Sequence, residues 1–257
     1  MDYLTVNKTA WDKRTKLHVA SKFYDVEGFL KGKSSLNPIE LDQVGNVAGK
    51  SLLHLQCHFG QDTLSWARLG AKVTGVDLSS EAVAQAKNLA VRSGLEATFI
   101  EADIYQFGDE NSEQFDLVFT SYGALCWLPD LTKWAQTIAR ALKVGGEFHL
   151  VEFHPINELL PAGYSYFSQD QPDIEDGGTY TENCDGQQST MMTWAHPLSE
   201  VINSLITAGL SLQAVHEYPF SPYDCFDGLE LVEGHGYQML YKEQQVPLVY
   251  SIKASKS

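Results

Sequence analysis

One stretch, Ser51 to Asp77, constrains the fold of this chain more than any other. Its apolar runs and turn residues predict four successive elements: a buried strand (51–57), a tight turn (58–60), a helix (62–69) and a second strand (72–76). Two parallel strands joined by a helix leave a crevice at the carboxyl ends of the strands. Free N–H groups of the helix terminus point into this crevice, so a small ligand can bind there.

Asp77 stands at the end of the second strand, 17 residues after Gly60. In nucleotide-binding units, an acidic residue about 20 residues beyond the glycine turn accepts hydrogen bonds from both hydroxyls of a ribose. The spacing therefore predicts that the crevice binds a ligand that contains a nucleoside.

The rest of the chain continues the alternation of strands and helices, which predicts an α/β fold with a parallel sheet. Ser79 or Ser80 can cap the next helix, and Gly94 ends it. Asn7 or Thr9 is expected to cap a short N-terminal helix. The remaining predicted elements are strands at 97–102, 115–121, 147–153, 210–217 and 246–253 and helices at 128–142 and 197–208.

The net charge of −15 makes binding to nucleic acid or to an anionic membrane surface electrostatically unfavourable. We therefore expect a small-molecule partner, no nucleic-acid or membrane partner, and a monomer or homodimer. No apolar run reaches the ~18 residues of a membrane span, and the N-terminus lacks the apolar segment of a signal peptide. These features predict a cytoplasmic protein, and its four scattered cysteines are interpreted as reduced thiols.

A series of motifs follows in order between residues 45 and 155: His54-Leu55-Gln56-Cys57-His58-Phe59-Gly60, Gly75-Val76-Asp77-Leu78-Ser79, Glu101-Ala102-Asp103-Ile104, Phe115-Asp116-Leu117-Val118-Phe119 and Leu142-Lys143-Val144-Gly145-Gly146. Their order and spacing resemble the class I S-adenosylmethionine-dependent methyltransferases. In that family the first strand usually ends in an acidic residue, and a Gly-x-Gly-x-Gly loop follows. Here His54 replaces the acidic residue, and only the third glycine, Gly60, is kept.

The resemblance implies a doubly wound, mainly parallel seven-stranded sheet with helices on both faces and an antiparallel C-terminal hairpin strand. It implies S-adenosylmethionine as the cofactor and transfer of its methyl group to a small-molecule acceptor. Residues 1–47 are expected to form a cap over the cofactor, with 48–257 as the methyltransferase domain. The Pro- and Gly-rich segment 155–196 is expected to be an inserted flap or hairpin.

The resemblance also assigns roles to residues that would bind the cofactor. Asp77 would accept hydrogen bonds from the ribose hydroxyls. Leu78 and Ile104 would enclose the adenine, and Asp103 would accept a hydrogen bond from the adenine amino group. The backbone of Gln56, His58 and Gly60 would line the methionine and the ribose, although side chains at 56 and 58 oppose close approach and positive φ. Trp11 is a lid candidate together with Tyr24 and Phe29, with ordinary packing as the alternative. Ala102 and Ser121 complete the predicted cofactor set.

Candidate catalytic and substrate residues lie further along the chain. Tyr122 and Trp127 follow the fourth strand and are expected near the methyl-transfer site, or else in the core. His154 lies at the carboxyl end of the fifth strand, where it is either a general base or a structural histidine that binds the next loop. Tyr166 and Trp194, in the flap, are expected to contact the substrate. No metal is expected, because strand alternation places Cys57 on the opposite face from His54 and His58.

Two other functions stay open. The altered glycine loop would suit a protein that binds S-adenosylmethionine without catalysis. A nicotinamide-dependent oxidoreductase would share the strand–helix–strand unit, but its pyrophosphate needs a close backbone approach that Gln56 and His58 oppose.

Overall fold

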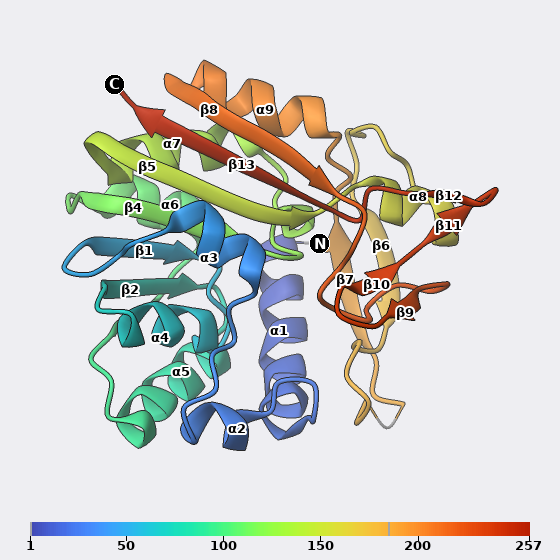
Figure 1. Cartoon of the computed structure of the whole chain (residues 1–257), viewed down its shortest axis with the longest axis horizontal. Coiled ribbons are helices and arrows are strands. Elements are labelled where there is room, and N and C mark those ends of the chain that lie inside the picture. Colours follow the sequence, from blue (N-terminus) through green and yellow to red (C-terminus); the bar gives the residue numbers. More distant parts are fainter. Residues whose placement is uncertain (1, 185) are drawn as a thin grey trace.

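The computed structural model describes residues 2–184 and 186–257. Its centre is a seven-stranded sheet with the strand order β3-β2-β1-β4-β5-β13-β8 (Figure 1). The first five strands run parallel, while β13 lies antiparallel between β5 and β8. This topology confirms the predicted fold class. The strands are β1 (Ser51–Leu55), β2 (Lys72–Asp77), β3 (Thr98–Glu101), β4 (Phe115–Ser121), β5 (Leu142–Phe153), β8 (Leu210–Tyr218) and β13 (Val249–Lys256).

Helices cover both faces of this sheet, which explains why its central strands are apolar along their whole length. On one face, Leu53 and Leu55 of β1 share a core with apolar residues of α6, α7 and α9. On the other face, Leu52 packs with residues of α3 and α4, and α5 contributes to a neighbouring cluster. These helices are α3 (Pro38–Val44), α4 (Gln61–Arg68), α5 (Ser80–Ser93), α6 (Ile104–Glu110), α7 (Leu131–Ala141) and α9 (Leu198–Thr207).

The order of the strands reverses between β1 and β4, whose connections leave toward opposite sides of the sheet. Ligands of open α/β sheets bind at such a switch point, beyond the carboxyl ends of the strands. Strand β1 ends at Leu55, two residues earlier than predicted, because Gln56 already adopts a left-handed backbone with φ of 56°. The turn at 56–60 and the loop after Ser121 therefore face each other at this point.

Helix boundaries follow local capping chemistry. Ser79 caps α5 by accepting from the Ala82 N–H, and Gly94 ends the helix in a left-handed conformation, as predicted. Helix α7 begins three residues later than predicted because Asp130 caps it, accepting from the Lys133 N–H. The residues before it form a short 3₁₀ helix, η1 (Leu125–Trp127), and α6 was not predicted from the sequence.

The N-terminal helix α1 (Tyr3–Ala20) is capped by Asp2, so the prediction of a cap at Asn7 or Thr9 was wrong. The helix runs beside α5 and the hairpin β6 (Asp173–Gly177) and β7 (Ser189–Thr193) (Figure 1). Asp12 of α1 accepts hydrogen bonds from the Ser79 hydroxyl at 2.6 Å and from the Glu81 N–H at 3.1 Å. These contacts hold α1 over the end of β2.

Asn7 fastens α1 to the hairpin, because its side chain donates to the Met192 carbonyl at 2.8 Å and accepts from the Met192 N–H at 2.9 Å. We expect Asn7→Ala to lower the free energy of unfolding by about 2 kcal/mol, since it leaves two buried backbone groups without partners. Urea denaturation measures the change. Asn46→Ala is the control, because Asn46 accepts only an exposed bond from the Ala48 N–H. Equal losses in the two variants would contradict this role.

The remaining elements lie outside the sheet. Segment 155–196 contains α8 (Ile156–Ala162) and the hairpin, and a projecting arm follows β8 (Figure 1). The arm contains β9 (Glu230–Val232), β10 (Gly236–Gln238), β11 (Leu240–Tyr241) and β12 (Gln244–Gln245), and α2 (Val26–Leu30) lies in the N-terminal segment. Within the described residues, no helix combines the length and the apolar character needed to cross a membrane.

Candidate active site

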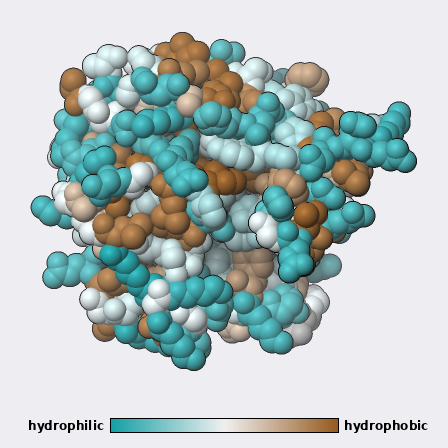
Figure 2. All heavy atoms as spheres, in the orientation of Figure 1, coloured by the Kyte–Doolittle hydropathy of each residue, from teal (hydrophilic) through white to brown (hydrophobic). Residues whose placement is uncertain are grey.

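Two adjoining cavities, of about 450 and 120 Å³, lie at the switch point between β1 and β4. Figure 2, drawn in the orientation of Figure 1, shows a hollow near the middle of the molecular surface. The cavities adjoin each other, because the same residues line both. The residues that line both are Trp11, Tyr24, Gln56, His58, Ser121, Tyr122, Gly123, Trp127 and Tyr180.

Asp77 lies at the wall of the smaller cavity and is held by two backbone groups. One carboxylate oxygen accepts from the His58 N–H at 2.7 Å, and the other accepts from the Ser79 N–H at 2.9 Å. Burial raises the pKa of Asp77 to about 6, although the hydrogen bonds from the two N–H groups lower it. A desolvated carboxylate with spare lone pairs is a strong acceptor for hydroxyl groups of a ligand.

The lining of the smaller cavity also includes apolar groups and a second acidic group. Leu78 and Ile104 both line it, next to Asp103. One oxygen of Asp103 caps α6 by accepting from the N–H groups of Tyr105 and Gln106, at 3.0 and 3.1 Å. This arrangement suits a flat heteroaromatic ring with an amino group, because the second oxygen of Asp103 is not used by the cap.

The turn between Gln56 and Gly60 keeps a glycine-like backbone although two of its residues carry side chains. Gln56 and His58 have φ angles of 56° and 51°, and Gly60 has φ of 81°. The Gln56 side chain donates to the Ala124 carbonyl at 2.7 Å, which links the turn to the loop after β4. The predicted conflict is thus resolved by left-handed conformations that cost of order 1 kcal/mol or more each.

Comparison with known proteins assigns this architecture. Residues 52–146 match the family model described as a methyltransferase domain. A ubiquinone biosynthesis O-methyltransferase of Pseudoalteromonas translucida is 31% identical over 152 residues, which are 58% of this chain and 62% of that protein. Residues 52–146 therefore match a methyltransferase domain. Another protein of the same name, from Salmonella newport, is 33% identical over 50% of this chain and 54% of its own length. The chain thus spans less than two thirds of these relatives.

Solved structures share the fold of the methyltransferase domain. An S-adenosylmethionine-dependent methyltransferase from Clostridium acetobutylicum aligns with a TM-score of 0.61 and 15% identity, covering 98% of both chains. One from Mesorhizobium loti aligns with a TM-score of 0.57 and 21% identity, covering 88% of this chain and all of that one. At this identity the likeness concerns the fold.

The structure brings most of the predicted cofactor residues of the methyltransferase domain together. The residues of this set that line the smaller cavity are Trp11, Gln56, His58, Asp77, Leu78, Asp103, Ile104 and Ser121. Gly60 lines the larger cavity. Ala102 is not among the described lining residues. Its N–H donates to the Asp77 carbonyl at 3.0 Å, so it supports the wall from behind.

Tyr122 and Trp127, both predicted near the methyl-transfer site, line both cavities. The Trp127 ring N–H donates to the Gly123 carbonyl at 2.8 Å, which fixes the ring. Burial raises the pKa of Tyr122 well above its usual value. The phenol therefore stays protonated at neutral pH and can bind or orient a ligand, but it does not act as an ionised base.

His154, predicted as a general base or a structural histidine, is not among the residues that line either described cavity. Its Nδ1 accepts from the Ile156 N–H at 3.2 Å, and its Nε2 lies 2.9 Å from a Glu217 carboxylate oxygen. These bonds match the structural alternative, in which the histidine holds the loop after β5. Its neighbour Glu152 is buried and accepts from the N–H groups of Gly123, Ala124 and Leu125, so it shapes the loop that carries Tyr122.

The two predicted substrate residues of segment 155–196, Tyr166 and Trp194, are not among the residues that line the described cavities. The Trp194 ring packs edge-on against Tyr3, with 5.4 Å between ring centroids, and the backbone N–H of Trp194 donates to the Cys126 carbonyl. Trp194 therefore supports Tyr3, which does line the smaller cavity. Tyr166 packs against Phe167, a residue that is 70% exposed. Among the described residues of segment 155–196, Tyr180 lines both cavities.

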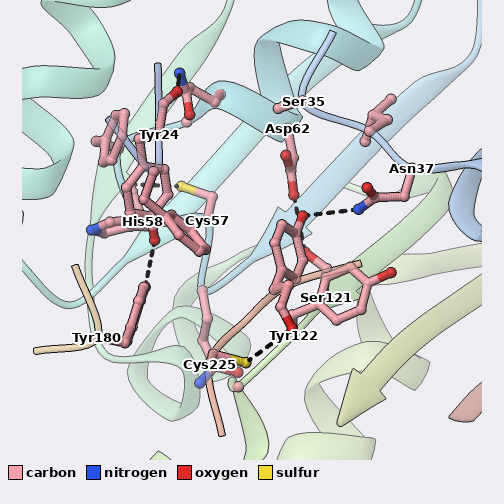
Figure 3. Close-up of a pocket in the computed structure, with 18 of the residues that line it drawn as sticks. Tyr24, Ser35, Asn37, Cys57, His58, Asp62, Ser121, Tyr122, Tyr180 and Cys225 are labelled. Atoms are coloured by element: carbon pink, nitrogen blue, oxygen red, sulfur yellow. Dashed lines mark hydrogen bonds between the residues drawn. The ribbon is translucent and has the colours of Figure 1, made fainter. Parts of the chain in front are cut away.

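Several lining residues were not assigned a role from the sequence. Asp62, Arg14 and Tyr180 come from three different segments, and Figure 3 shows Asp62 pointing into the cavity. The Tyr24 and Tyr180 hydroxyls form a hydrogen bond, and His18 Nδ1 lies 3.2 Å from His58 Nε2. These contacts connect the N-terminal segment to the loop between β6 and β7 and to the turn at 56–60. For Asp62, its place in the first turn of the helix after Gly60 was the available signal.

The sequence cluster of His54, Cys57 and His58 does not form a common site. The His54 ring is buried, with its Nδ1 2.8 Å from the Thr63 hydroxyl, while His58 pairs with His18. Across the described part of the chain, no group of three or more His, Cys, Asp or Glu side chains is arranged to hold a metal ion.

Proposed function

We propose that the protein transfers the methyl group of S-adenosylmethionine to a small-molecule acceptor bound in the larger cavity. The observation that carries the proposal is the position of Asp77: a half-buried carboxylate at the tip of β2 that lines a cavity adjoining a second, larger one. The cofactor would supply a methyl group already activated on a sulfonium. The protein then has mainly to align the acceptor with it and exclude water.

The residues of the smaller cavity fit the adenosine part of this cofactor. Asp77 would accept hydrogen bonds from the ribose hydroxyls, and Leu78 and Ile104 would enclose the adenine. The Asp103 oxygen that the helix cap does not use would accept a hydrogen bond from the adenine amino group. The shared wall, with Gln56, His58 and Ser121, would direct the sulfonium toward the larger cavity.

The larger cavity supports an acceptor of modest size with aromatic or polar character. Phe153, Tyr223 and Phe226 contribute ring faces, while Ser35, Asn37 and Asp62 contribute polar groups. Burial raises the pKa of Glu40 to about 8, so this neighbouring carboxyl is mostly protonated at neutral pH and can donate a hydrogen bond. Tyr122, with its intact phenol, would orient the acceptor beside the methyl group.

A thermal-shift comparison separates this function from a nicotinamide-dependent one. A ligand that binds the folded state raises the unfolding midpoint by mass action. We expect S-adenosylhomocysteine to raise the midpoint and NADH to leave it unchanged at the same concentration. The reverse result would refute the cofactor assignment.

Turnover separates catalysis from binding alone. We expect methyl transfer from radiolabelled S-adenosylmethionine to at least one member of a panel of phenols, amines, thiols and carboxylates. A protein that binds S-adenosylhomocysteine but methylates no panel member would favour the non-catalytic alternative.

The affinity for S-adenosylhomocysteine is expected to fall in acid. The pKa of Asp77 is raised to about 6, and ribose hydroxyls bind best to the ionised carboxylate, so affinity should be full at about pH 7.5 and about tenfold lower at pH 5. In the unliganded protein the sign is opposite, because a raised carboxyl pKa lowers stability as pH rises through about 6. Calorimetry at the two pH values, with Asp77→Asn as the control, measures the effect. Equal pH dependence in both proteins would contradict it.

A further inference from the structure

Asp62 is a half-buried carboxylate without a cationic partner among the described residues. It lies in the first turn of α4 and lines the larger cavity. One oxygen accepts from the Ser121 hydroxyl at 3.2 Å, and no ion pair of the described residues includes it. Burial raises the pKa of Asp62, and the groups that lower it are the hydroxyls of Ser35 and Ser121. An ionised carboxylate in such a place is costly unless a cation binds to it.

The end of β1 supplies no negative charge of its own. His54 stands there, fully buried, and burial lowers its pKa to about 3, so the ring is neutral. The ring is held by the Thr63 hydroxyl, and Thr63 directly follows Asp62. The first turn of α4 therefore brings a carboxylate to the place where β1 has a neutral histidine.

A second acceptor lies between the two cavities. The side-chain oxygen of Gln56 is buried and has no hydrogen-bond partner among the described residues, although Gln56 lines both cavities. Its nitrogen is already used by the Ala124 carbonyl. An ammonium group has three N–H donors and can satisfy more than one acceptor.

We propose that Asp62 binds the α-ammonium group of the methionine part of S-adenosylmethionine, with the Gln56 oxygen beside it. The inference rests on the proposed function. A cofactor held by its ribose at Asp77 would pass along the turn at 56–60, and this turn leads directly into α4, where Asp62 faces the cavity (Figure 3). The charge-assisted hydrogen bond gives the carboxylate the cation that the protein itself does not provide.

Two ligands that differ only in the amino-acid part test the assignment. S-adenosylhomocysteine carries the ammonium group, whereas 5′-methylthioadenosine keeps the adenosine and the sulfur but lacks it. We expect Asp62→Asn to lower the affinity for S-adenosylhomocysteine about ten- to a hundredfold, as measured by calorimetry. The affinity for 5′-methylthioadenosine should change less than about twofold. Asp42→Asn, an exposed change of the same charge, should alter neither affinity.

Unchanged affinity for S-adenosylhomocysteine in Asp62→Asn would overturn the inference and would point to an amine in the acceptor instead. An equal loss for both ligands would also overturn it, because it would indicate a distorted turn. If the wild-type protein binds neither ligand, the proposed function itself fails.

A second measurement needs no variant. The deamino analogue of S-adenosylhomocysteine should bind the wild-type protein at least about tenfold more weakly than the parent compound. Equal binding of the two would exclude an ammonium site, even if Asp62→Asn does not fold.

Discussion

Asp77→Asn is expected to weaken the binding of S-adenosylhomocysteine about a hundredfold. The ionised carboxylate would accept two ribose hydroxyls, and each such charge-assisted bond contributes roughly 1.5 kcal/mol or more, so losing both costs about 3 kcal/mol. The amide can accept only at its oxygen, and its NH₂ group would face the His58 or Ser79 N–H that the carboxylate now binds.

The ligand pair used for Asp62 distinguishes the two carboxylates. Because 5′-methylthioadenosine also carries the ribose, Asp77→Asn should lower the affinity for both ligands by the same factor. Asp62→Asn should lower only the affinity for S-adenosylhomocysteine. Calorimetry below the unfolding midpoint of each variant measures both effects. An affinity of Asp77→Asn within about threefold of the wild type would contradict the ribose assignment.

Gly60→Ala is expected to destabilise the fold by about 2–4 kcal/mol. A Cβ at this position would lie 2.7 Å from two atoms of the Phe99 ring and 3.0 Å from the Ala86 Cβ, and φ is +81°. Phe99 is buried at 4% exposure, so the ring has little room to move. Left-handed strain contributes about 1 kcal/mol, and overpacking adds about 1–3 kcal/mol.

Gly94→Ala is the matched control for Gly60→Ala. Gly94 has φ of +66°, but its Cβ would meet no atom within 4 Å. It should therefore show the left-handed strain alone, about 1 kcal/mol. Urea denaturation of both variants gives the difference, and equal free energies of unfolding would show that the contact with Phe99 is unimportant.

The same contact explains which glycine of the loop is kept. Gln56 and His58 also have positive φ, yet they line the cavities, where a side chain has space. Gly60 alone turns its missing side chain toward a packed ring. The sequence showed that two glycines are replaced, but whether the backbone would follow depended on packing that the sequence does not display.

The central fold was predictable because its signals are local. Hydrophobic runs, Ser79 and Gly94 mark the elements, and Asp77 at the end of β2 marks the cofactor site. By contrast, Tyr180 reaches the cavities because the hairpin folds back onto α1, more than 150 residues away along the chain. The contact between His154 and Glu217 could not be predicted for the same reason, since Glu217 lies far along the sequence.

The central claim is that the cleft beside Asp77 binds S-adenosylmethionine or its demethylated product. Calorimetric titration of S-adenosylhomocysteine into the purified protein tests it most directly. The structure predicts saturable binding with one ligand per chain. A titration without binding heat, repeated at a second temperature to exclude a vanishing enthalpy, would contradict the account.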